Sequence, residues 1–366
     1  GGAVRRSRTD GASRRLCQAF MRKRVAAPIL QKERTTALSK KQNPARITKI
    51  GGQALIEGIM MKGADRSAMA VRKKDGEIDV EVWDNKPKQW YNKAPFVRGV
   101  FNFVGQLLEG TKYMNKSMEK SGYLEDEEEP SKFEKWLEEK GGKSLTNIIM
   151  GVGTVLGIAL ALVLFMFVPT WIYTGIQYLA GDTDISAFRS LFEGILKIII
   201  FISYMALTSL MKDIRRTYEF HGAEHKTIAT YEADEELTVE NVKKHTRFHP
   251  RCGTSFIFLV LAISILVYSI VPINSEMFME WWGVGQFAAD LIRVGFKILL
   301  LPATVGISYE VIRLAGRYNN IVTKIISAPG LAMQRLTTKE PDDEQIKCAI
   351  AAITPVLPKE GEDDSW

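Results

Sequence analysis

The sequence predicts a mainly α-helical membrane protein, with about four transmembrane helices and a small N-terminal cytoplasmic region of β-hairpin and helices. Two uncharged stretches, Ser144–Gly181 and Gly253–Ser275, each exceed the ~20 apolar residues that a helix needs to cross a bilayer. Two further apolar stretches, about Ser190–Met211 and Phe287–Tyr309, hold only a few charged residues. A soluble helical core is the alternative, which we disfavour because soluble helices rarely stay apolar on every face.

The charge of the chain is uneven along its length. Residues 1–50 hold 14 Lys and Arg against two acidic residues, so this leader carries +12 while the whole chain carries +7. The remainder is therefore net acidic, and the total charge indicates no nucleic-acid partner. The leader is typical of a segment that contacts anionic lipid, or of a targeting segment that is processed.

The region after the leader contains short elements. Two strand-like runs, about Ser67–Arg72 and Glu77–Trp83, flank Asp75-Gly76, a dipeptide that favours a hairpin turn. Apolar residues then recur with helical period from Pro95 to about Met118, which predicts an amphipathic helix. A short interfacial helix is expected over residues 131–143.

A glycine-bounded stretch, GGQALIEGIMMKG, precedes the hairpin at residues 51–63. It lacks the spacing of a phosphate-binding loop. We expect either a strand and turn that approach the functional site, with Gln53 or Glu57 supporting it, or a plain structural turn.

The spans carry features of their own. The first is expected to end near Pro169–Tyr173, where aromatic residues suit a membrane interface. Lys197, Arg293 and Lys297 lie in the outer halves of the second and fourth spans, and we expect them to snorkel to the interface. A charge pathway through the membrane is the alternative.

Orientation follows from the basic residues beside the spans. Residues 212–252 hold eight Lys and Arg, whereas the connections after the first and third spans hold one Arg in total. The positive-inside rule therefore predicts that both termini and residues 212–252 are cytoplasmic. We expect the bacterial plasma membrane, or an organellar membrane if the leader is a transit sequence.

These observations divide the chain into six parts. They are a basic leader, disordered or processed (1–49), a cytoplasmic α+β region (50–143), a first transmembrane pair (144–211), a cytoplasmic histidine-containing segment (212–252), a second transmembrane pair (253–310) and a cytoplasmic tail (311–366).

All four histidines lie between His221 and His249. In HGAEH, two imidazoles stand four residues apart, so on a helix His221 and His225 share one face. This is the H-x-x-E-H pattern, in which two histidines hold Zn²⁺ and the adjacent carboxylate, here Glu224, acts as general base. The segment therefore predicts a divalent metal site, with zinc as the expected ion.

Further ligands are predicted from residues that meet the same membrane face. They are His245, His249 and Cys252, which lead into the third span, and Glu310 at the inner end of the fourth. A closed structural site made of the four histidines competes with an open catalytic one, and the two extra glutamates favour the open site. Cys252 could instead be a small buried residue, and His245 could lie on a solvated face.

Several motifs occur together in one order: GGQALIEGIMMKG, PFVRGV, HGAEHK, LTVENV, HPRCGTSF and SYEVIRLAGR. In these motifs the chain resembles the YqhQ-type family of bacterial membrane proteins, from about Ile50 to Leu357. The resemblance implies a membrane location and a metal at His221 and His225, as expected for predicted metal-dependent enzymes. It implies no substrate.

Three functions remain open from the sequence. The first is a polytopic membrane metalloenzyme, hydrolase-like or metallopeptidase-like, with a cytoplasm-facing zinc site. The second is a non-enzymatic membrane scaffold or assembly factor whose metal site is structural. The third is a transporter or metal sensor that uses Lys197, Lys297 and Glu310 as a path. The expected partners are the lipid bilayer and either other membrane proteins or a peptide substrate.

Overall fold

The structure is a computed structural model that describes residues 47–87, 89–122, 151–181, 188–271, 274–318 and 320–358. All of these belong to one compact unit, Ile47–Trp366. Residues 1–46 of the basic leader and the interfacial helix predicted over residues 131–143 lie outside the described residues.

Four antiparallel strands form a meander in the order β1-β2-β3-β4. Their bounds are Gly51–Leu55 for β1, Gly58–Lys62 for β2, Arg66–Arg72 for β3 and Ile78–Asp84 for β4. The pair β3–β4 confirms the predicted hairpin, and Gly76 supplies the positive φ of 86° that its turn requires. The glycine-bounded stretch forms β1, a tight turn and β2.

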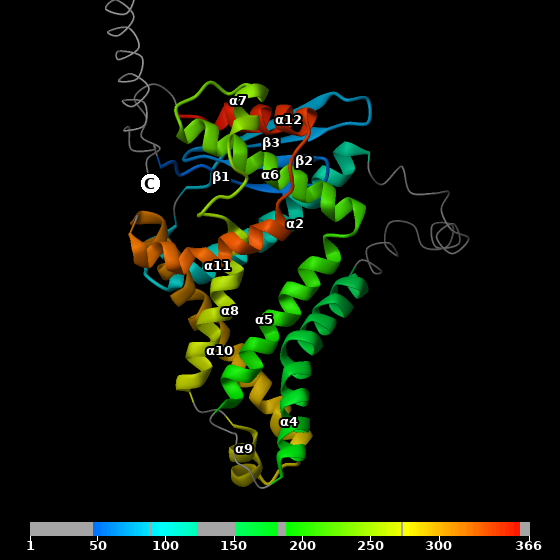
Figure 1. Cartoon of the computed structure of the whole chain (residues 1–366), viewed down its shortest axis with the longest axis vertical. Helices are drawn as coiled ribbons and strands as arrows, with labels where there is room; N and C mark the ends of the chain where they lie inside the picture. Colours follow the sequence, from blue (N-terminus) through cyan, green and yellow to red (C-terminus); the bar gives the residue numbers. More distant parts are fainter. Residues whose placement is uncertain are drawn as a thin grey trace, which may run out of the picture. The chain divides into compact units, whose positions relative to one another are not determined.

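The period-two pattern of the strands gives the sheet two apolar faces. Ile59, Met61, Ala68 and Ala70 pack with residues of α6 (Lys212–Glu232) and α12 (Asp343–Ile353). The opposite face carries Met60, Met69 and Val71, against which Tyr113 of α2 (Val97–Ser121) packs. The sheet is therefore held between helices, as Figure 1 shows, and α2 confirms the predicted amphipathic helix.

Four helices in the described part are long and apolar enough to cross a membrane, namely Gly151–Ala180, Arg189–Thr208, Gly253–Ile270 and Gln286–Ala315. The first contains a π-helical turn, η3 (Val163–Phe167), and continues as α4 (Val168–Ala180). The others are α5 (Arg189–Thr208), α8 (Gly253–Ile270) and α10 (Gln286–Arg317). The chain is thus an integral membrane protein, as predicted.

The expected end of the first span near Pro169 was wrong, because the helix continues to Ala180. Pro169 lies two residues after the π-helical turn, inside the continuous helix Gly151–Ala180. Proline removes one backbone N–H donor from a helix, and local π-helical turns are one adjustment by which membrane helices tolerate it.

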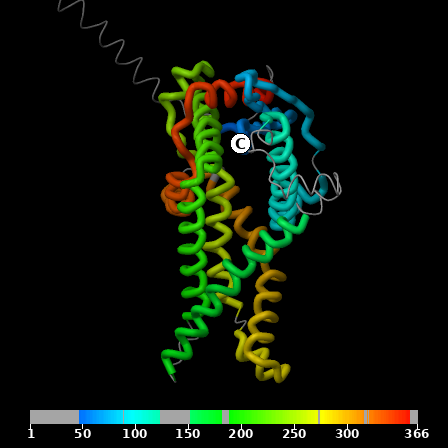
Figure 2. The backbone as a smooth tube through the Cα atoms, turned by 90° about the vertical axis from the view of Figure 1, so that its right-hand side faces the viewer, coloured from blue at the N-terminus to red at the C-terminus, as the bar shows by residue number. Residues whose placement is uncertain are grey.

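Three further helices complete the unit. The first is the short helix α7 (Val239–Lys244), whose cap Thr238 accepts a hydrogen bond from the Asn241 N–H group. Sequence analysis did not predict α9 (Ser275–Trp282) and α11 (Ile321–Thr337). Single 3-10 turns occur at Trp90–Lys93 and Thr354–Val356. Figures 1 and 2 show α9 at the far end of the spanning helices from the sheet.

Candidate metal centre

The two histidines of HGAEH lie on α6, as the spacing predicted. Their ring centroids are 4.4 Å apart, and His225 is almost fully buried. Opposite them, Cys252 is the N-terminal cap of α8. Its Sγ lies 3.2 Å from His221 Nε2. One donor atom from each of the three side chains lies within 4.8 Å of the other two. A single metal ion could therefore be held between α6 and the start of α8.

Backbone carbonyls orient both imidazoles. His221 Nδ1 lies 2.8 Å from the Thr337 carbonyl oxygen, and His225 Nδ1 lies 2.6 Å from the Arg247 carbonyl oxygen. A carbonyl only accepts, so each Nδ1 must carry the hydrogen and donate it. In the neutral rings this leaves Nε2 as the atom with a lone pair. Histidines that bind metals are commonly fixed in this way through the other ring nitrogen.

Glu224 stands beside the histidines and is buried. Its Oε2 is one of three side-chain polar atoms in the described part that have almost no exposed surface and make no hydrogen bond, together with Thr227 Oγ1 and Arg247 Nε. Such atoms are uncommon, because leaving a buried acceptor unpaired costs roughly 1–3 kcal/mol. The free oxygen fits a site that receives a ligand or a proton.

Strand β1 approaches Glu224 closely. A Cβ atom at Gly52 would lie 2.9 Å from Glu224 Cδ and 2.7 Å from the Met60 carbonyl oxygen. The Gly52 backbone also favours the charged form of Glu224, against the effect of burial. The expectation that the glycine-bounded stretch approaches the site is thus met, but through Gly52. Gln53 donates to the Gly110 carbonyl oxygen, and Glu57 pairs with Arg72 and Arg216.

Burial and neighbouring charges shift the pKa values of three side chains in the site. Burial opposes ionisation of Cys252, but the nearby charges of His221 and His225 outweigh burial and hold its pKa well below the usual range. Burial would likewise lower the pKa of His221, yet the Cys252 charge and hydrogen bond raise it to about 9. For Glu224, burial dominates and raises the pKa. In the absence of a metal, these shifts favour a Cys252 thiolate beside a His221 imidazolium, next to a carboxyl group that holds its proton more tightly than usual.

Imidazole and thiolate are both ligands that zinc uses, and catalytic zinc sites commonly have three protein ligands. Thiolate and imidazole are also the softer ligands that select zinc over magnesium or calcium. His221, His225 and Cys252 are therefore the residues that fit a metal here.

His249 lies beside this cluster, with its ring centroid 5.5 Å from that of His225. Its Nε2 is 3.2 Å from Arg251 Nη2 and 3.7 Å from Glu232 Oε2. Its backbone N–H and carbonyl are both held by Gln334. The structure thus places this predicted ligand next to the three donors, with its Nε2 close to Arg251 and Glu232.

The other two predicted ligands do not join the cluster. Glu310 accepts hydrogen bonds from the Arg98 guanidinium and the Phe96 N–H, which tie α10 to the start of α2. His245 Nε2 pairs with Glu235 at 3.2 Å. Each has a partner elsewhere, Arg98 for Glu310 and Glu235 for His245, so neither lies with the three donors as predicted.

Sequence reasoning missed the residues that orient the site. Thr337 and Arg247 act through their carbonyl oxygens, which every residue possesses, so no residue type signals them. Gly52 was also missed, since Gln53 and Glu57 were expected in its place, but it carries a signal, because a glycine within a strand often marks a close backbone approach.

The described fold is that of a polytopic α-helical membrane protein, with a His-His-Cys cluster where a sheet-based region meets the ends of the spans. The chain belongs to the family described as "Protein of unknown function (DUF1385)", which matches residues 94–359. It is 33% identical over 316 residues to "Uncharacterized protein YqhQ" of Bacillus subtilis (strain 168), covering 84% of this chain and 92% of that protein. No solved structure matches the chain. The predicted membership of the YqhQ-type family is confirmed.

Proposed function

We propose that this protein is a membrane metal-dependent hydrolase with a zinc site that faces the cytoplasm. His221, His225 and Cys252 would bind the ion, and Glu224 would act as general base. The observation that carries the proposal is the unpaired, buried Glu224 oxygen next to three convergent donors.

An open site is favoured by the number of donors. Three side chains converge, whereas a closed structural zinc site uses four protein ligands. His249, the obvious fourth, has its Nε2 close to Arg251 and Glu232. A structural site would also have no use for a buried carboxylate without a hydrogen bond on one oxygen.

The residues of the chain then have distinct tasks. Zinc with three protein ligands supplies a Lewis acid that activates water or polarises a carbonyl group. Glu224 accepts the proton from the attacking water, and its raised pKa allows it to hold that proton and return it to the leaving group. Thr337 and Arg247 keep the two imidazoles in the orientation described above. A peptide or another membrane protein is the substrate that we expect at this position.

A structural role is the second candidate, and the connections of the cluster favour it. The three donors and their carbonyl partners come from α6, α8, the end of α11 and the loop after α7. A metal there would fasten the spans to the sheet-based region, as a scaffold or assembly factor would require.

Glu224→Gln separates the two candidates, because it removes the base while keeping the shape of the side chain. Cells that lack their own family member would express the wild type, Glu224→Gln or the control Glu235→Gln, which alters an exposed partner of His245. Protein termini and metabolites would then be compared by mass spectrometry. We expect Glu224→Gln to match the empty vector with its zinc retained, and Glu235→Gln to match the wild type. A Glu224→Gln profile equal to that of the wild type would support the scaffold instead.

A further inference from the structure

A second cluster of charged side chains lies within the spanning helices α5 and α10 and shares no residue with the metal centre. On α5, Arg189, Glu193 and Lys197 recur every four residues, and on α10 a similar row contains Arg293 and Lys297. All five are at most 7% exposed, so the expectation that Lys197, Arg293 and Lys297 reach the interface was wrong. At ~1.5 Å per residue, Lys197 lies roughly 12 Å into α5, within the hydrocarbon region of a spanning helix.

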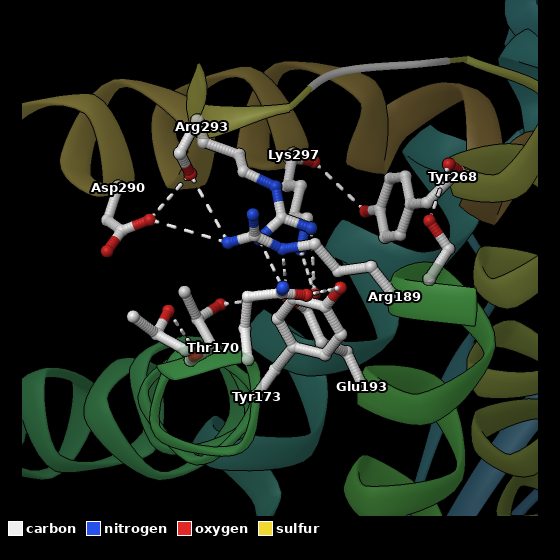
Figure 3. Close-up of polar contacts among 12 residues, drawn as sticks. Thr170, Tyr173, Arg189, Glu193, Tyr268, Asp290, Arg293 and Lys297 are labelled. Atoms are coloured by element: carbon white, nitrogen blue, oxygen red, sulfur yellow. Dashed lines mark hydrogen bonds and ion pairs between the residues drawn. The ribbon is translucent and has the colours of Figure 1, made fainter. Parts of the chain in front are cut away.

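Glu193 is the centre of this cluster. It accepts hydrogen bonds from Arg293 at 2.6 and 3.0 Å, from Lys297 at 2.5 Å and from Arg189 at 3.1 Å. Figure 3 shows these three side chains converging on it from two helices. Asp290 provides the other buried carboxylate, 3.5 Å from Arg189. Buried ionisable groups in a membrane are paired as a rule, and they commonly mark a functional path or binding site.

The charges do not balance. Among the described residues of this cluster, four cationic side chains, Arg189, Lys197, Arg293 and Lys297, face two buried carboxylates. Glu276 also contacts Arg189, but it is largely exposed at the end of the span. With all groups ionised, the buried part has an excess of two positive charges, which is costly in an apolar medium.

Among the charged side chains of this cluster, Lys197 has no hydrogen-bond partner in the part of the chain that the structure describes. It makes no hydrogen bond and no ion pair with any residue that the structure describes. Its Nζ lies 5.5 Å from the centroid of the Tyr268 ring, and Lys297 Nζ lies 5.8 Å from the same ring. The aromatic face partly stabilises the ammonium group, but it supplies no hydrogen-bond acceptor.

We propose that Lys197, with Lys297 and Arg293, forms an intramembrane binding site for a phosphate group. A phosphate carries the negative charge that the cluster lacks and offers acceptors to the unpaired ammonium of Lys197. Two sources share this chemistry, the phosphodiester of an anionic lipid and free inorganic phosphate. The site is separate from the metal centre and does not depend on the proposed hydrolase.

The full-length protein in nanodiscs of neutral phosphatidylcholine tests this site in two arms. In one arm, phosphatidylglycerol is titrated into the discs, and the lipids retained are counted by native mass spectrometry. In the other, inorganic phosphate is titrated, and the shift in melting temperature is measured. We expect saturable binding in one arm, and Lys197→Met should weaken it at least tenfold.

Lys324→Met is the matched control, because Lys324 is an exposed lysine on α11. It should leave the binding unchanged. Lys197→Met should retain its zinc and melt no lower than the wild type, since it removes an unpaired buried charge. Binding in the lipid arm identifies a lipid ligand, and binding in the phosphate arm a free anion. The proposal fails if neither arm saturates. It also fails if Lys197→Met binds the ligand as tightly as the wild type and Lys324→Met do.

Discussion

His221 and His225 meet because four residues make about one helical turn, and sequence spacing predicts such contacts well. Cys252 was named as a ligand, but only the packing of α8 against the site brings its Sγ to His221. Glu310 shows the limit of this reasoning. A carboxylate near a site can join it or pair elsewhere, and nothing in the sequence singles out Arg98 as its partner.

The lowered pKa of Cys252 predicts an unusual reactivity. In metal-free protein, alkylation of Cys252 by iodoacetamide should change little between about pH 6 and pH 8, because the thiolate is already formed. An ordinary thiol, with a pKa of about 8.5, gains roughly tenfold in rate per pH unit over this range. Added zinc should protect Cys252. The rates are measured by site-resolved mass spectrometry.

Cys348 is the internal control for this measurement. Burial raises the pKa of its thiol to about 12, and its Sγ donates to the Ala70 carbonyl oxygen. It should stay unmodified throughout. A Cys252 rate that climbs with pH like that of an ordinary thiol would contradict the charge pairing with His221.

At the scale of elements, periodicity predicted the helices that carry an unbroken apolar pattern and missed those that break a local rule. α2 and the four spans belong to the first kind. α11 belongs to the second, because its Pro329-Gly330 pair is typical of a turn. Gly330 is needed there for a different reason, since a Cβ atom would lie 2.5 Å from Ser255 Cβ on α8. The close packing of α11 against α8 explains why glycine stands in this helix, and the sequence does not show that packing.

Gly222 makes the same point within HGAEH and leads to a test. A Cβ atom at Gly222 would lie 1.9 Å from the Lys339 carbonyl oxygen, so α6 can pack against this segment only with glycine there. We expect Gly222→Ala to lower the free energy of unfolding by about 1–3 kcal/mol, the usual cost of overpacking. It should also weaken zinc binding, because displacing Lys339 would shift the neighbouring Thr337 carbonyl, which orients His221. Unfolding is followed by intrinsic fluorescence in a denaturing detergent.

Gly105→Ala on α2 is the matched control, because no atom lies within 4 Å of its Cβ position. At this position alanine should leave the free energy of unfolding unchanged or raise it by roughly 0.5–1 kcal/mol. Equal stability of the two variants would show that α6 does not depend on this close approach.

For the whole molecule, hydropathy predicted the membrane class and the number of apolar helices. It could not show that charged residues of the second and fourth spans face each other, because that depends on how the helices are rotated about their axes. The sequence predicted the hairpin of β3 and β4 more clearly than the pairing of β1 and β2. That hairpin has a turn signal, whereas β1 and β2 meet at Glu57, whose positive φ of 51° is unusual for a residue other than glycine.

The orientation of the molecule can be tested at its two ends. Because residues 212–252 carry most of the basic residues near the spans, we expect the sheet side to be cytoplasmic. A cysteine placed at Asp75 should then react with a membrane-impermeant maleimide only after spheroplasts are permeabilised. A cysteine at Glu280 on α9 should react in intact spheroplasts. The reverse pattern, read by mass spectrometry of the labelled peptides, would overturn the assignment.

The metal content of the purified protein tests the central claim most directly. Elemental analysis of the wild type should find about one zinc ion per chain. His225→Ala should lose it, whereas His245→Ala should keep it, because His245 pairs with Glu235 away from the three donors. Wild-type protein that takes up no divalent metal, or equal metal content in the two variants, would contradict a metal centre at His221, His225 and Cys252.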